Sequence, residues 1–152
     1  MEQTVAEPEP KAGVITVLQV LTNFLGNFNL NPPVIGDLIL EFENTSGVKL
    51  PEDYVSFLRL GNGGEGFIGL SSYTILWKLE ELQQFNEEYE VSKYAPGLFL
   101  IGSNGGGEAF AFDTRDAGLA VVQVPFVGMD IEYAEVLGAT FTQFLQRLYE
   151  EE

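Results

Sequence analysis

The chain has 152 residues, the length of one domain, and 45% of them are apolar, which is enough to fill a sizeable core. It contains neither Cys nor His, so thiol nucleophiles, thiolate or imidazole metal sites and Ser-His-Asp triads are excluded. The lack of Cys fits a reducing compartment, and we expect a cytoplasmic protein.

The chain is strongly acidic. Seven Lys and Arg oppose 23 Asp and Glu, which gives a formal net charge of −16. Such a surface repels phosphate backbones and anionic membranes, so neither nucleic acid nor a membrane is expected as a partner. A basic protein would be attracted, and salt would weaken the attraction. The alternative is that the acidity only keeps the domain soluble.

Residues 1–12 combine acidic residues with two prolines and lack an apolar run, which predicts a disordered acidic tail. Residues 13–33 form an N-terminal apolar segment. Within it, residues 14–28 carry apolar side chains at three- and four-residue spacing, which predicts an amphipathic helix packed on the domain. This helix is too short and too polar on one face to span a bilayer. The alternative is a surface for self-association or for a partner.

Two further helices are predicted before the first strand. Residues 34–42 have a helical apolar pattern, with Pro33 near the start and Thr45-Ser46-Gly47 at the end. The second helix follows in the stretch LPEDYVSFLRLGNGG, residues 50–64, where we expect Pro51 at the first helical position. Its apolar stripe contains Tyr54, Phe57 and Leu58, and the glycines of residues 61–64 end it in a left-handed turn.

In the rest of the chain, segments with the composition of strands alternate with segments whose apolar residues have helical spacing. Aromatic and β-branched residues predict strands at residues 67–70 and 73–77, and a helical pattern follows at residues 78–90. Residues 98–101, 109–113 and 119–124 suit an antiparallel meander, and residues 131–137 form a last strand or an irregular segment. Phe141, Phe144, Leu145 and Leu148 mark a final helix. We therefore expect one α+β domain: an antiparallel sheet of about four to six strands, with helices on one face and at both ends.

Three of these motifs, in this order, resemble the SMI1/KNR4 (SUKH) family. They are L-P-x-D-Y-x-x-F-L with its Asn-Gly-Gly turn, the strand and Gly-rich turn of residues 99–108, and the closing F-x-x-F-L at Phe141. The resemblance defines a domain at residues 34–149. It implies an immunity protein that neutralises a polymorphic toxin, often a nuclease, if the chain is bacterial, and cell-wall regulation if it is fungal. The matching positions are turn and core positions, so no catalytic residue is carried over.

No motif in the sequence identifies a phosphate-binding, metal-binding or catalytic site. Gly105-Gly106-Gly107 lacks the helix, Lys and Ser/Thr of a phosphate loop, which favours a tight hairpin turn. Possible oxygen ligands for Ca²⁺ match no calcium-loop spacing: Asn104, Glu108, Asp113, Asp116 and Asp130. Turn chemistry and solvation account for Asn104, Asp113 and Asp116. Paired carboxylates can hydrolyse glycosides, yet nothing singles out a pair among Glu65, Glu108, Asp113 and Glu132. We expect no enzyme, no metal and no cofactor.

The sequence instead favours a protein-binding domain that occludes a basic toxin domain, as a monomer or weak dimer. Partner-binding candidates lie in or beside predicted loops: Glu65, Asp113, Asp116, Asp130 and Glu132. The alternative function is an intracellular scaffold or small-ligand-binding regulator with a groove near Tyr73 and Trp77. The competing interpretation of these two aromatic residues is that they belong to the core or its edge.

Overall fold

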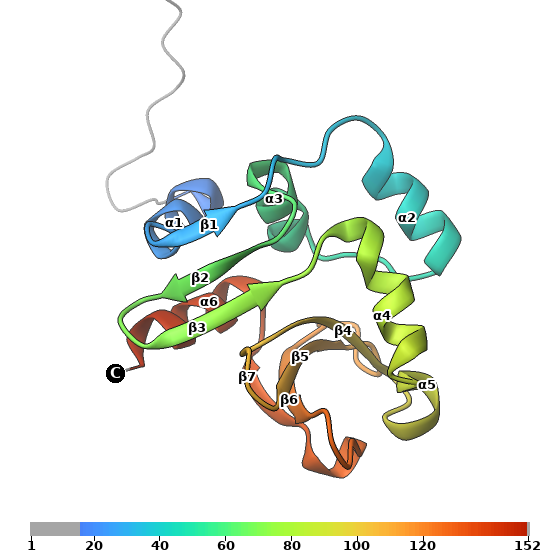
Figure 1. Cartoon of the computed structure of the whole chain (residues 1–152). Helices are drawn as coiled ribbons and strands as arrows, with labels where there is room; N and C mark the ends of the chain where they lie inside the picture. Colours follow the sequence, from blue (N-terminus) through green and yellow to red (C-terminus); the bar gives the residue numbers. More distant parts are fainter. Residues whose placement is uncertain (1–15, 152) are drawn as a thin grey trace, which may run out of the picture.

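The computed structural model describes residues 16–151, in which six α-helices, two 3₁₀ helices and seven strands follow one another (Figure 1). In chain order they are α1 (Val17–Phe24), β1 (Phe28–Leu30), α2 (Leu38–Ser46), α3 (Glu52–Leu60), β2 (Gly64–Ile68), β3 (Ser72–Leu76), η1 (Leu79–Glu81), α4 (Leu82–Glu88), α5 (Val91–Tyr94), β4 (Leu98–Ser103), β5 (Glu108–Asp113), β6 (Val121–Pro125), η2 (Ile131–Tyr133), β7 (Glu135–Gly138) and α6 (Phe141–Glu150).

The seven strands form one antiparallel sheet in the order β1-β2-β3-β4-β5-β6-β7, so each strand pairs with its neighbours in sequence. Antiparallel neighbours need no crossover connection, and the chain can therefore build the sheet as a meander. The predicted α+β class and antiparallel sheet are confirmed. The strand number is slightly above the expected four to six, because β1 adds an edge strand by pairing Phe28 with Gly66.

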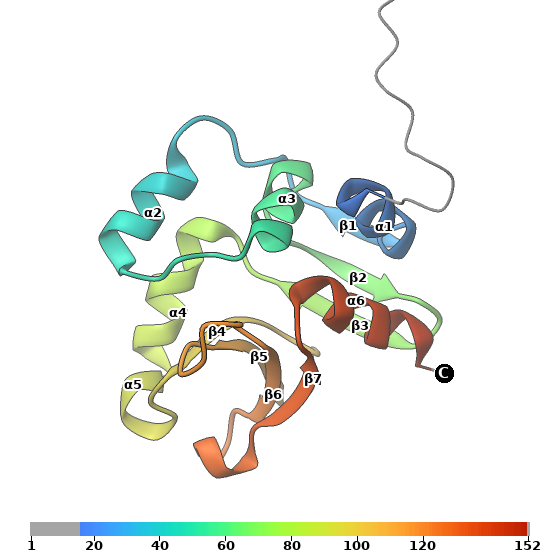
Figure 2. The same ribbon diagram turned by 180° about the vertical axis from the view of Figure 1, so that it is seen from behind.

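The main core lies on the face of the sheet that α1, α3 and α6 cover (Figure 2). Tyr54 and Phe57 of α3 meet Phe141 of α6 and Phe112 of β5, and all four side chains are buried. The Tyr54 ring centroid lies 5.0 Å from that of Phe141 and 5.1 Å from that of Phe112. The apolar stripes predicted in the 50–58 and 141–148 segments are thus packing stripes.

A second, smaller core lies on the opposite face of β4, β5 and β6. Val91 of α5 packs there with Leu100 of β4, Ala111 of β5 and Val122 of β6. All six residues of β4 are buried, as in a strand that is covered on both sides. Helix α5 therefore belongs to this second layer, whereas Leu82, the buried residue of α4, packs in the main core.

Helix α4 also takes the place of a strand beside β4. Strands β3 and β4 share only two residue pairs, Ile75 with Ser103 and Leu76 with Gly102. Beyond this point the Asn86 side chain of α4 accepts the N–H of Leu100 at 2.7 Å and donates to the carbonyl of Leu100 at 3.0 Å. Asn86 thereby forms hydrogen bonds with the buried N–H and carbonyl of Leu100, with which β3 does not pair.

Several helix boundaries differ from the prediction. The helix expected at residues 14–28 ends at Phe24, and its first two residues lie outside the described residues. Helix α2 starts at Leu38, because Gly36 (φ +65°) interrupts the chain after Pro33. The helix predicted at residues 78–90 is divided into η1 and α4. The acidic tail predicted at residues 1–12 also lies outside the described residues.

The turn after α3 is built differently from the expected left-handed helix end. Pro51 occupies the N-cap of α3, and Gly61 at its C-cap is extended. Gly63 adopts the left-handed conformation instead (φ +71°), and a Cβ there would lie 2.3 Å from the Leu76 carbonyl oxygen. Only glycine fits this position, because the backbone of β3 passes too closely.

Helix α1 packs against α3 and α6. Leu21 and Leu25 are buried in the main core, and the Phe24 ring lies 5.2 Å from that of Tyr149. Val17 and Leu18 stay about half exposed. Among residues 16–151, no helix has the length and apolar character that crossing a membrane requires.

Candidate functional site

A groove runs between α2 on one side and η1 with α4 on the other, and we call it the α2–α4 groove. It consists of two consecutive hollows of about 500 and 480 Å³ that share Gln83. The first hollow is lined by Pro33, Val34, Ile35, Leu38, Glu41, Phe42, Thr45, Asn62, Leu79, Glu80 and Gln83. The second continues along α4 to α5 and the start of β4.

The α2 wall of the groove is largely apolar. Leu38, Glu41, Phe42 and Thr45 line it at three- and four-residue spacing, so they share one face of the helix. Ile39 is the only buried residue of α2, and the Leu38 side chain is 52% exposed. The apolar stripe that predicted a core helix therefore points partly into an open groove.

The opposite wall is acidic. Glu80, Gln83, Glu87 and Glu90 follow one another at intervals of three and four residues and line the two hollows. The Asn62 side chain donates to Glu80 Oε1 at 2.7 Å, and this hydrogen bond lowers the pKa of Glu80. Glu80 is therefore ionised at neutral pH. Among the described residues, the first hollow is lined by two carboxylates and by no cation.

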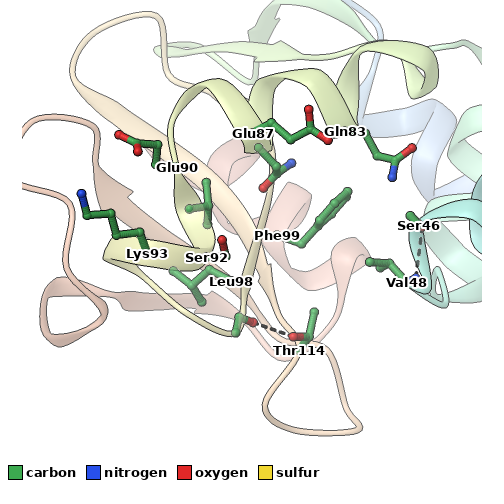
Figure 3. A pocket seen from close by; sticks show the side chains of 13 residues that line it. Ser46, Val48, Gln83, Glu87, Glu90, Ser92, Lys93, Leu98, Phe99 and Thr114 are labelled. Carbon is green, nitrogen blue, oxygen red and sulfur yellow. Dashed lines mark hydrogen bonds between the residues drawn. The ribbon is translucent and has the colours of Figure 1, made fainter.

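The second hollow is more mixed in character (Figure 3). The buried Phe99 side chain forms part of its floor, with Gln83 and Glu87 on the α4 side and Val48 near α2. Lys93 lies at the α5 end of this hollow and places a cation beside the acidic wall. Lys93 is the one cation among the described residues that line the two hollows, and Lys78, just before η1, partly offsets the charge of Glu80 from outside the lining.

Asn62 fixes the position of the acidic wall, a role that the sequence interpretation missed when it treated this residue as part of a turn. Its side-chain oxygen accepts the N–H of Leu79 at 2.7 Å, which holds the start of η1. Its backbone N–H donates to the Pro32 carbonyl at 3.1 Å. Both contacts join residues that are far apart in the chain, so the local Asn-Gly-Gly motif indicated a turn and gave no signal for this role.

The five predicted partner-binding residues lie in three separate places. Glu65 lies on the exposed side of β2 and accepts the hydroxyl of Tyr73, which raises the pKa of Tyr73. Asp113 and Asp116 lie at the β5–β6 turn, whereas Asp130 and Glu132 lie in the β6–β7 connection, at the other end of β6. None of the five lines the α2–α4 groove.

Three of these acidic residues have contacts within their own turns, and one of them, Asp116, accepts the N–H of Gly118 at 3.3 Å. Asp113 forms an ion pair with Arg115 at 2.9 Å, and the hydrogen bonds from this side chain lower the pKa of Asp113. The Asp130 side chain accepts the N–H of Glu132 at 2.9 Å and caps η2. Substitution of Asp113 or Asp130 therefore changes a turn as well as a surface charge.

The two predicted groove residues do not share a hollow. Tyr73 is 37% exposed and packs edge-on against Phe67, with ring centroids 5.3 Å apart. Trp77 is half-buried and lies 4.5 Å from the Phe85 ring of α4, within an aromatic group that also includes Tyr89. Trp77 therefore joins β3 to α4, which matches the core-edge interpretation of this residue.

The Gly105-Gly106-Gly107 segment forms the β4–β5 hairpin turn. The Asn104 side chain accepts the N–H groups of Gly106 at 2.8 Å and Glu108 at 3.2 Å, an arrangement typical of an Asx turn. Within residues 16–151, no group of three or more acidic side chains is placed to hold a metal ion.

Comparison with curated proteins finds no significant match. A family model described as SMI1 / KNR4 family (SUKH-1) matches residues 33–147. The matched region starts at the edge of the α2–α4 groove and contains both of its walls, while α1 and β1 precede it. Because the match covers most of the 152 residues, the chain belongs to the SMI1 / KNR4 family (SUKH-1).

Proposed function

We propose that this chain is a non-catalytic immunity protein that binds a bacterial toxin domain and neutralises it by occlusion. Family membership supports the proposal, because SUKH domains are often immunity proteins and are generally non-catalytic. The partner is a basic domain, for example a nuclease, whose positive active-site surface the acidic protein covers.

The observation that carries the proposal is the concentration of negative charge on the η1–α4 segment. Five carboxylates lie between residues 80 and 90, and four of them are exposed: Glu80, Glu87, Glu88 and Glu90. Charges of one sign on one surface speed the encounter with an oppositely charged protein by about 10- to 1,000-fold. Screening over about 10 Å at 0.1 M salt reduces this gain.

The experiment starts with the toxin domain encoded beside the gene for this chain. The two proteins are co-expressed, and we expect survival of the host, co-purification and a saturable calorimetric titration. The association rate should fall about tenfold or more as salt rises from 50 to 500 mM. If none of the neighbouring gene products forms a complex, the proposal is wrong.

Matched charge reversals locate the contact surface. Glu87→Lys and Glu88→Lys alter the acidic helix, whereas Glu132→Lys alters an exposed position in the β6–β7 connection. We expect the first two substitutions to slow association more than the third, with melting temperatures close to that of the unmodified protein. Glu65, Asp116 and Glu132 remain candidate contacts from the sequence, and the same measurement tests each of them.

The second candidate function is a small-ligand-binding regulator, which the apolar α2 wall of the first hollow favours. A volume of about 500 Å³ lies within the usual range for small-molecule pockets. A metabolite library screened by thermal shift tests this function. A compound that raises the melting temperature, together with failure of every neighbouring gene product to bind, would favour the regulator over the immunity protein.

A further inference from the structure

We propose that the α2–α4 groove binds a basic amphipathic helix of the protein partner. This inference rests on the proposed function, because the helix belongs to the toxin domain that the chain neutralises. It goes further by assigning the contact to one groove and by specifying the chemistry and secondary structure of the segment that enters it.

The apolar surface of α2 is the first reason. Ile35, in the loop before α2, is 72% exposed, and Leu38 is 52% exposed, although both belong to the apolar pattern of this segment. Both side chains line the first hollow together with Phe42. Burying such side chains against an apolar partner removes their apolar surface from water and stabilises a complex. These apolar side chains are not buried by the fold of this chain, so a partner can bury them.

The backbone hydrogen bonding of the two walls favours one conformation for the partner segment that enters the groove. Both walls are helices, whose N–H and carbonyl groups are bonded within each helix, so they offer no ladder of main-chain hydrogen bonds to an extended peptide. A segment that enters the groove must satisfy its own backbone groups, and a helix does so. Helix-in-groove binding then uses apolar anchors at positions i, i+3 or i+4, and i+7.

The apolar and charged side chains on the two walls indicate which residues the partner helix carries. The α2 wall presents Leu38 and Phe42 together with one carboxylate, Glu41. The facing wall presents Glu80 and Glu87. A matching helix carries an apolar stripe toward α2 and an adjoining stripe of Lys or Arg toward α4. Helix α4, residues 82–88, spans roughly 10 Å, so a partner helix of two or more turns can lie along it. A second copy of this chain fits poorly, because its net charge of −16 opposes association.

The α2 helix supplies a matched pair of variants. Leu38→Gln changes a groove residue that is 52% exposed, and Leu40→Gln changes a residue of the same type that is 57% exposed and lines a hollow on the α3 side of α2. Both side chains are largely in water, so neither substitution should impair folding. Thermal melting of the two variants checks this expectation, and Ile35→Gln provides a second groove variant.

The first probe is a labelled synthetic 15-residue peptide of Leu and Lys with an amphipathic helical pattern, measured by fluorescence anisotropy at 150 mM salt. A scrambled peptide of the same composition is the control for non-specific attraction to an acidic protein. We expect Leu38→Gln and Ile35→Gln each to weaken binding of the patterned peptide about tenfold or more, and Leu40→Gln to change it less than twofold. The scrambled peptide should bind at least tenfold more weakly.

Equal binding of the two peptides, or equal effects of Leu38→Gln and Leu40→Gln, would overturn the groove assignment. The same variants are then titrated with the toxin domain. If the toxin domain binds both variants as it binds the unmodified chain, the groove inference fails while the immunity function stands. If the patterned peptide binds through the groove but no neighbouring gene product forms a complex, the immunity function fails instead.

Discussion

Asn86→Ala removes the side chain that forms hydrogen bonds with the β4 backbone at Leu100, where β3 no longer pairs with β4. In the folded protein Asn86 accepts the N–H of Leu100 at 2.7 Å and donates to the carbonyls of Leu100 at 3.0 Å and Leu82 at 2.8 Å. Leu100 is fully buried, and Asn86 is the hydrogen-bond partner of both its N–H and its carbonyl.

The expected loss of stability follows from these contacts. A buried backbone group left without its partner costs about 1–3 kcal/mol, and Leu100 loses a partner for its N–H and for its carbonyl. Alanine has a higher helix propensity than asparagine, and this difference stabilises α4 by about 0.5 kcal/mol. We therefore expect Asn86→Ala to lower the free energy of unfolding by about 2–4 kcal/mol.

Urea denaturation followed by circular dichroism measures this change. The midpoint should fall, and the slope of the unfolding free energy against urea should stay the same, because the unfolded chain exposes a similar surface. Gln84→Ala is the matched control on α4, since this exposed side chain bonds only with Glu88 on its own helix. If Asn86→Ala and Gln84→Ala both stay within about 0.5 kcal/mol of the unmodified protein, the strand-replacing role of Asn86 is wrong.

Three further predictions concern the core and the turn after α3. Phe57→Ala should lower the free energy of unfolding by about 3–5 kcal/mol in the same assay, because the side chain is fully buried; an unchanged midpoint would contradict its place in the core. Gly63→Val should sharply reduce the yield of folded protein, since its Cβ would meet a carbonyl at 2.3 Å, whereas Gly118→Val at an open position should not; equal yields would refute the turn geometry. Burial raises the pKa of Tyr54, so its contribution to stability is present below the unfolded pKa of about 10 and declines as the pH rises above it. Tyr54→Phe should therefore show a smaller loss of stability above pH 10 than the unmodified protein, and an identical pH profile would contradict the assignment.

Local sequence patterns were sufficient to predict the α+β class, the antiparallel meander and most of the apolar helix faces. These features depend on local spacing: Tyr54, Phe57 and Leu58 in α3 recur at helical intervals, and a residue at such a position faces the core wherever the helix lies. The motifs that indicated the SUKH family are local in the same sense. The absence of Cys and His and the excess of acidic residues are also properties of composition alone.

The edge strand and the second core depend on contacts between distant parts of the chain, which local patterns do not contain. Three residues of β1 carry little periodicity, and they are extended because Phe28–Leu30 pair with the glycine-containing β2. The position of α4 beside β4 likewise depends on where β3 leaves the sheet. Asn86 gives only a faint local signal, a polar residue with low helix propensity inside a helix, and its long-range partner Leu100 appears only when the chain is folded.

The groove is the feature that sequence periodicity could least predict. The apolar stripe of α2 is the same whether it meets a core or an open groove, and only its distance from η1 and α4 leaves Leu38 half exposed. The predicted acidic candidates failed to converge for a related reason, since Asp116 and Glu132 are separated by β6, with one beyond each end of this strand. Local spacing determines which face of an element a residue occupies, whereas the surface it shares with other residues depends on how distant elements pack.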